Sequence, residues 1–358
     1  MPNSELMPIG VFARRTGLTA SALRFYADSG LLPPVEVDPV SGYRYYGADQ
    51  VARAAALRQL REIAMPLTAV EVVLDAEPDE ASRLIDVHVA KVLGDAAVLL
   101  QKVASIKSSL TDVPSLSIAA LKGPVLADAI EQVLTATVRE PGMPVLGALR
   151  IEVTQEAVTL IATDRYRLAI RTLVPAEAAA ATWAATVDGD ELRAAVADIR
   201  RSALVRIEAT PHGLWLRMAD RGDRHCRLLS EEFPDHRLML ASLPEATTRV
   251  TVSKDLLLRT LEEHPGARIT LRVTHQGLNV LATEAEPEPL GVPLTATVTG
   301  QGLQISFELT TLYPAVSTAI GPDVMLDLRG PDQPVTIRSA DRGDLTTLAM
   351  PIKLDHSA

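Results

Sequence analysis

The decapeptide IATDRYRLAI, residues Ile161 to Ile170, places two arginines, an aspartate and a tyrosine between apolar residues. No catalytic motif stands on either side of it. Across the whole chain there is no nucleophile elbow, no glycine-rich phosphate loop and no pair of carboxylates at a spacing typical of a catalytic pair. An enzyme therefore has little support, and the role of this stretch must come from the segments around it.

The decapeptide belongs to a duplicated region. VTQEAVTLIAT (153–163) and VTHQGLNVLAT (273–283) share Val, Thr, Ala and Thr at an offset of 120 residues, and ADRGD at 219 recurs at 340, an offset of 121. Two independent matches at nearly one spacing predict two copies of one domain. We place the copies at residues 118–244 and 245–358. The RGD triplets predict tight hairpin turns.

Within each copy, a strand runs twice into a short helix. The four segments are SIAALKGPVLADAIEQVL (117–134), AATVDGDELRAAVADI (184–199), RVTVSKDLLLRTLEE (249–263) and LQISFELTTLYPAVSTA (303–319). The residues between them alternate apolar and polar, as hairpin strands do. This pattern predicts two α+β domains, with helices grouped on one face of antiparallel sheets.

A linker (111–117) and a long helix (77–110) precede the duplicated region. Apolar residues follow steps of four and three along this helix, which is the heptad pattern of a coiled coil. The pattern predicts a homodimer, and the alternative is a lone amphipathic helix packed on its own domain. The predicted dimerisation residues are Ile85, Val89, Val92, Ala96, Leu99, Val103, Ile106 and Leu110.

The first 76 residues predict an all-α domain with a wing. In IGVFARRTGLTASALRFYADSGLL (9–32), Gly17 ends one helix and Thr19 caps the next, which predicts a helix-turn-helix. A glycine-centred turn then sets Tyr43, Arg44 and Tyr45 at the tip of a wing, and helices follow at 49–63 and 68–74. Residues 8–62 hold seven Arg against five acidic residues, whereas residues 115–358 hold 24 basic and 31 acidic residues. Any contact with DNA should therefore lie in the N-terminal part of the chain.

This region resembles the DNA-binding domain of the MerR family of transcription regulators, and the likeness rests on RFYADSGLL followed by SGYRYY. The resemblance implies a dimer on promoter DNA that activates RNA polymerase by distorting the promoter. It also implies that Arg24 and Tyr26 face the groove, while Phe25 stands where the family usually has Tyr. For Tyr43, Tyr45 and the two arginines of the first helix, packing or plain solvation is the alternative. The predicted DNA-binding residues are Arg14, Arg15, Thr19, Ser21, Arg24, Tyr26, Tyr43, Arg44 and Tyr45.

The duplicated region resembles the second and third domains of the bacterial DNA polymerase III β sliding clamp. The likeness rests on ATDRYRLA (162–169), EEFPDHRLMLASLP (231–244) and LAMPIKLD (348–355). It implies an apolar cleft for peptide tails, with Leu168 as floor and Arg167 as polar anchor, while Arg165 and Tyr166 replace the usual Gly and His. The alternative is a cleft kept only as core. The predicted ligand-binding residues are Leu146, Thr163, Arg165, Tyr166, Arg167, Leu168, Pro234, Met350, Pro351, Ile352 and Leu354.

Composition narrows the function further. The single cysteine, Cys226, excludes an intramolecular disulfide, and no Cys/His set has the spacing of a zinc site, so we expect neither metal nor cofactor. Lack of a leader and of a membrane-spanning apolar run predicts a cytoplasmic protein without membrane contact. Our first hypothesis is a regulator whose clamp-like region senses a peptide-like ligand, such as a clamp-directed antibiotic. The alternative is a DNA-tethered platform that recruits clamp-binding replication or repair proteins.

Overall fold

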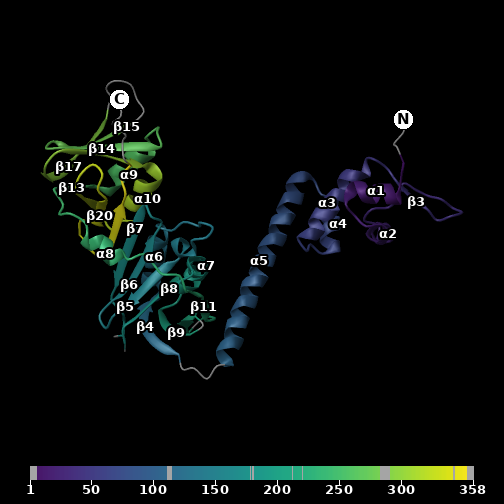
Figure 1. Ribbon diagram of the computed structural model, residues 1–358, viewed down its shortest axis with the longest axis horizontal. Coiled ribbons are helices and arrows are strands. Elements are labelled where there is room, and N and C mark those ends of the chain that lie inside the picture. Colours follow the sequence, from purple (N-terminus) through teal and green to yellow (C-terminus); the bar gives the residue numbers. More distant parts are fainter. Residues whose placement is uncertain are drawn as a thin grey trace. The chain divides into compact units, whose positions relative to one another are not determined.

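The chain forms two compact units, Met1–Val103 and Ala104–Ala358, shown in Figure 1. The computed structural model describes residues 6–110, 115–177, 179, 181–211, 213–219, 221–282, 291–341 and 343–352. Leu354 and most of the predicted linker lie outside the described residues. Within these ranges, no helix combines the length and the apolar character needed to cross a membrane.

The first unit begins with the predicted helix-turn-helix, α1 (Ile9–Thr16) and α2 (Ala20–Asp28). Gly17 ends α1 in the left-handed region at φ 72°, and its N–H donates to the carbonyl of Ala13 at 3.0 Å. Thr19 caps α2, because its hydroxyl accepts the N–H of Ala22 at 3.1 Å. The predicted end of α1 and the predicted start of α2 are therefore both confirmed.

The wing is a small sheet in the order β1 (Met7–Pro8), β3 (Arg44–Tyr46) and β2 (Glu36–Val37). Its turn closes early, because the N–H of Asp38 donates to the carbonyl of Tyr43 at 2.8 Å and the Asp38 carboxylate accepts two N–H groups within the turn. Arg44 and Tyr45 therefore lie on strand β3 and not at the tip as predicted. Tyr46 fixes that strand, since its buried ring stacks on Phe12 at 4.6 Å.

Three more helices complete this unit: α3 (Gln50–Glu62), α4 (Leu67–Asp75) and the start of α5 (Pro78–Ser109). Phe12, Leu23 and Leu57 are fully buried in its core. Ile85, at the beginning of α5, packs against the same core. This contact departs from its predicted place in the dimer seam.

The second unit is built on a ten-stranded sheet that continues through both clamp-like domains, and each domain adds a four-stranded sheet. The large sheet has the order β12 (Leu228–Leu229), β8 (Trp183–Val187), β5 (Leu149–Val153), β6 (Val158–Thr163), β7 (Arg167–Leu173), β21 (Leu345–Ala349), β20 (Val335–Ser339), β19 (Asp323–Leu328), β13 (Thr248–Ser253), β17 (Ala296–Gly300). The smaller sheets have the orders β11 (Arg224–Cys226), β10 (Gly213–Met218), β9 (Leu204–Thr210), β4 (Leu116–Lys122) and β16 (Val292–Leu294), β15 (Gly277–Ala282), β14 (Arg268–Thr274), β18 (Leu303–Glu308).

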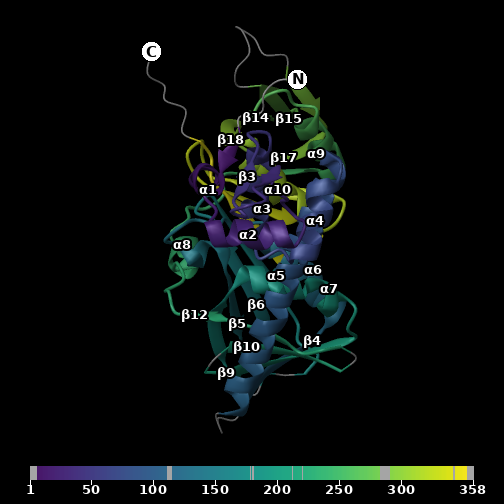
Figure 2. The same cartoon turned by 90° about the vertical axis from the view of Figure 1, so that its right-hand side faces the viewer.

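The four predicted strand-to-helix segments form as expected. They are completed by α6 (Gly123–Leu134), α7 (Gly189–Arg200), α9 (Lys254–Glu262) and α10 (Leu309–Ser317). Helices α6 and α7 lie side by side (Figure 2), and Arg200 of α7 pairs with Glu131 of α6 at 2.6 Å. The repeated sequences fall on the matching hairpins β5–β6 and β14–β15, each paired in antiparallel register. The internal duplication is therefore present in the fold.

Candidate DNA-binding and ligand-binding surfaces

The DNA-binding candidates of the helix-turn-helix lie mostly on the surface. Arg14 and Arg15 are exposed in the last turn of α1, and Ser21 and Arg24 are exposed on α2. Side chains that contact the groove and the phosphates of DNA must be exposed, as these four are on the helix pair. Thr19 is also exposed, but its hydroxyl is already used as the helix cap.

Tyr26 departs from the prediction. Its side chain is only 9% exposed and belongs to the core, because positions 23 and 26 fall on the same buried face of α2. The neighbouring Phe25 is 53% exposed and presents the aromatic surface instead. A ring available to DNA on this helix is therefore that of Phe25, which carries no hydroxyl.

Arg44 joins the wing to the second helix. Its guanidinium pairs with Asp28 at 2.8 Å and donates to the backbone carbonyl of Arg24 at 3.3 Å. The rings of Tyr43 and Tyr45 lie 5.6 Å apart on the same wing. The wing and α2 therefore present one continuous surface, with Arg44 partly committed to holding it together.

Helix α5 carries an apolar stripe whose side chains are largely exposed. Beyond Ile85, the predicted seam residues are exposed, and they are Val89, Val92, Ala96, Leu99, Val103, Ile106 and Leu110. Exposed apolar residues at heptad spacing are the mark of a helix that packs on another helix.

The three segments that carry the clamp resemblance converge in one place. Six buried side chains form what we call the junction cluster, and they are Val145, Leu146, Ile161, Leu168, Phe233 and Leu348. Strands β7 and β21 pair so that Leu168 stands opposite Leu348, and the N–H of Met350 donates to the carbonyl of Tyr166 at 2.8 Å. Residues separated by nearly 200 positions in the chain therefore share one apolar cluster.

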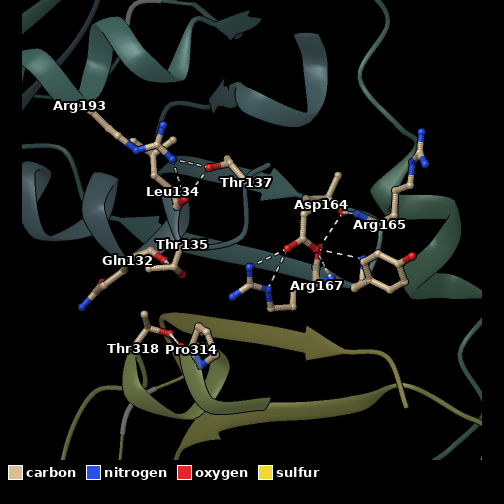
Figure 3. Close-up of polar contacts among 12 residues, drawn as sticks. Gln132, Leu134, Thr135, Thr137, Asp164, Arg165, Arg167, Arg193, Pro314 and Thr318 are labelled. Carbon is tan, nitrogen blue, oxygen red and sulfur yellow. Dashed lines mark hydrogen bonds and ion pairs between the residues drawn. The ribbon is translucent and has the colours of Figure 1, made fainter. Parts of the chain in front are cut away.

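The turn between β6 and β7 is fixed from within. The Asp164 carboxylate accepts the N–H groups of Tyr166 and Arg167 at 3.0 and 2.6 Å, and the hydroxyl of Thr163 donates to the Arg167 carbonyl at 2.7 Å. Asp164 also holds the Arg167 guanidinium, at 2.7 and 2.9 Å (Figure 3). Both side chains are largely buried. Arg167 is therefore bound within the turn instead of being free as the predicted polar anchor.

Arg165 points away from this pair (Figure 3). It has φ 76°, a conformation that costs a residue other than glycine roughly 1 kcal/mol. Its guanidinium pairs with Glu140 at 3.3 Å and contacts the sulfur of Met143. Asp164 and Thr163 hold the strained turn in place and keep Arg165 on the surface.

The side chains predicted to form the floor of the cleft are buried. Leu146 and Leu168 are 1% and 2% exposed, because side chains of the junction cluster cover them. What remains on the surface is a rim: Tyr166 is 64% exposed, Met350 is 39% exposed and Pro234 is exposed. Pro351 and Ile352 are half-buried, and the N–H of Ile352 donates to the Ser306 carbonyl at 2.8 Å.

Four members of the junction cluster were missed by the sequence analysis: Val145, Ile161, Phe233 and Leu348. Phe233 lies inside the quoted segment 231–244, and Leu348 lies near the end of the last strand, two positions before Met350. The alternation of inward and outward residues could have shown that Leu348 faces the same side as Met350. No local signal marks Val145.

A cavity of about 610 Å³ adjoins the cluster, and Phe233 and Pro234 line it. In its wall, Glu152 accepts hydrogen bonds from Arg237 at 2.5 Å and from Arg150 at 3.2 Å. Burial by itself raises the pKa of Glu152, but the two arginines outweigh it and hold the pKa below its ordinary value. Burial lowers the pKa of His236, which favours a neutral imidazole beside the cavity.

Cys226 is fully buried, and burial raises the pKa of its thiol far above the ordinary value, so no reactive thiolate forms. In the part of the chain that the structure describes, no three His, Cys, Asp or Glu side chains are grouped to hold a metal ion.

Comparison with known families matches both halves of the chain. The MerR HTH family regulatory protein model matches residues 7–77, and the model of the DNA polymerase III beta subunit, central domain, matches residues 120–235. The HTH-type transcriptional regulator CueR of Yersinia pestis is 35% identical over 107 residues, which cover 30% of this chain and 70% of that protein.

The clamp-like region is similar to sliding clamps of several bacteria. The beta sliding clamp of Streptomyces coelicolor is 26% identical over 257 residues, 65% of each chain. The beta sliding clamp homolog GriR of Streptomyces muensis is 25% identical over 204 residues, 55% of this chain and 54% of that protein. The chain therefore spans about two thirds or less of the length of these clamps.

Solved structures show the same fold. The beta subunit of Streptococcus pyogenes DNA polymerase has a TM-score of 0.61 at 19% identity, covering 68% of both chains. A sliding clamp of Pseudomonas aeruginosa bound to griselimycin has a TM-score of 0.61 at 18% identity, covering 67% of this chain and 66% of that one.

Proposed function

Since the chain belongs to the MerR family of HTH regulatory proteins and joins a MerR-type head to DNA polymerase III beta-like domains, we propose that it is a transcription regulator controlled by a ligand bound to its clamp-like region. Neither family is enzymatic. The ligand we propose is peptide-like and clamp-directed, of the kind represented by griselimycin.

DNA binding is supported by the surface of the N-terminal helix-turn-helix and wing. Arg14, Arg15 and Arg24 are exposed on the helix pair, and the wing is tied to the same surface through Arg44. Arginines on a small rigid surface bind the phosphate backbone and orient a helix in the groove. Promoter distortion that lets RNA polymerase start transcription is the mode of action we propose for the bound dimer.

The dimer part rests on α5. Its exposed seam begins at Val89, and Leu110 follows directly after the helix; a helix of this length with an exposed heptad stripe is stabilised by packing against a second copy. A two-fold dimer also matches a palindromic operator. We propose that the seam from Val89 onward, without Ile85, forms the coiled coil.

Ligand binding by the clamp-like region is supported by one observation, the convergence of the three segments on the junction cluster. Their exposed rim combines an aromatic ring at Tyr166, a flexible thioether at Met350 and the exposed ring of Pro234. Such a rim over an apolar cluster can take apolar anchors of a peptide-like compound, each contributing about 1.5–3 kcal/mol before association costs. The likeness to GriR and to the clamp bound to griselimycin supports this choice of ligand.

The test is a titration of the full-length chain with griselimycin, followed by transcription in vitro from the promoter that the chain protects. We expect binding and a ligand-dependent change in transcript. Met350→Asp and Tyr166→Ala should abolish both effects while leaving operator affinity unchanged. Val174→Asp, at another exposed apolar side chain, is the matched control.

Two outcomes would contradict the proposal. If griselimycin and clamp-binding peptides all fail to bind, the ligand site is wrong. If they bind with no change in transcript, the chain is instead a DNA-tethered docking platform for clamp-binding proteins, which was the alternative hypothesis.

A further inference from the structure

The cavity beside the junction cluster lies on the same face of the ten-stranded sheet as the cluster. Directly paired residues of neighbouring strands point to one face. The register places Leu229, Thr186, Arg150 and Ile161 in one row across β12, β8, β5 and β6. The first three line the cavity and Ile161 belongs to the cluster. The row therefore leads from a polar cavity directly to an apolar cluster.

The segment 230–243, which includes α8 (His236–Ala241), separates the two. Phe233 is buried in the cluster and also lines the cavity, so it forms a shared wall. On the cavity side, Arg237 anchors the segment to Glu152 on β5 at 2.5 Å. Pro234, exposed next to Phe233, belongs to both the rim and the cavity lining.

The two surfaces differ in chemistry. The cavity is lined by the guanidinium groups of Arg150 and Arg237, one N–H of each bound to Glu152, and by the carboxylate acceptors of Glu231 and Glu232. Peptide amides need both a donor and an acceptor, whereas a simple anion or cation needs only one kind. The cavity volume of about 610 Å³ lies within the range of roughly 300–1,000 Å³ typical of ligand pockets.

We propose that this cavity is the polar half of a two-part ligand site. It takes the amide-rich portion of a peptide whose apolar side chains rest on the rim of the junction cluster, and the peptide crosses from one to the other over Pro234. This inference rests on the proposed ligand binding and adds to it a second subsite and a minimum ligand length.

The test compares peptides of two lengths by calorimetry on the full-length chain. The short probe is the blocked pentapeptide Gln-Leu-Ser-Leu-Phe, and two longer probes add Gly-Ser-Asn to either its first or its last residue. One of the longer probes should bind about tenfold more tightly than the short one, since it alone reaches the cavity.

Ala184→Trp fills the cavity, because Ala184 is exposed in its wall. This variant should lose the gain from the longer probe while binding the short probe as the wild type does. Thr297→Trp, on the opposite edge strand β17, is the matched control and should keep the gain. Circular dichroism verifies that both variants fold.

If neither longer probe gains affinity in the wild type, or if the gain persists in Ala184→Trp, the cavity assignment is overturned while the rim stays intact. If even the short probe does not bind, the rim itself is wrong, and the two-part site fails with it.

Discussion

Leu168→Ala tests whether the junction cluster is packed as described. Leu168 is 2% exposed, so the substitution removes three buried carbons, worth about 0.8 kcal/mol each, and leaves a cavity among Leu146, Phe233 and Leu348. With the cavity included, the free energy of unfolding should fall by about 2–5 kcal/mol. For a unit of this size, that loss lowers Tm by roughly 4–20 °C.

Tryptophan fluorescence isolates the relevant transition, because the only two tryptophans of the chain, Trp183 and Trp215, lie in the first clamp-like domain. Met350→Ala is the matched control: its side chain is 39% exposed, and we expect a loss of no more than about 1 kcal/mol. A Leu168→Ala melt within a degree of the wild type would refute the packing. A charged residue at position 168 would likewise disrupt the cluster, because the side chain at this position is buried.

Three other changes address the remaining surfaces. Leu99→Arg buries a charge in the α5 seam and should convert the dimer to monomer in sedimentation, whereas a persisting dimer would place the interface elsewhere. Arg44→Ala should weaken operator binding and reduce the slope of log K against log salt by about 0.9, the effect of one phosphate contact, while Asp28→Asn should keep that slope. The folded-state pKa of His236 lies below the unfolded value of 6.5, so the unfolded chain takes up the proton first. Stability should therefore decline as pH falls through 6.5, and His236→Asn should flatten that decline in fluorescence melts; an unchanged pH dependence would show that another group causes it.

Local signals in the sequence were sufficient for the helix ends. Gly17 stops α1 and Thr19 caps α2 because a left-handed residue and a side-chain acceptor act on backbone groups within four positions. The helical spacing of Leu23 and Tyr26 also places both on one face, so Tyr26 could have been assigned to the core from the sequence. The expectation of a DNA contact there came from the family motif instead.

Burial at the candidate site depended on tertiary structure. The sequence identified the three segments of the junction cluster, but Leu168 is closed over by Phe233 and Leu348, which are distant in the chain. The Asp164–Arg167 pair, at 2.7 Å, joins residues only three positions apart, so this contact is local in the sequence. Capping and periodicity act between near neighbours and can be read from the chain itself, whereas exposure is set by whatever packs on a residue from elsewhere in the fold.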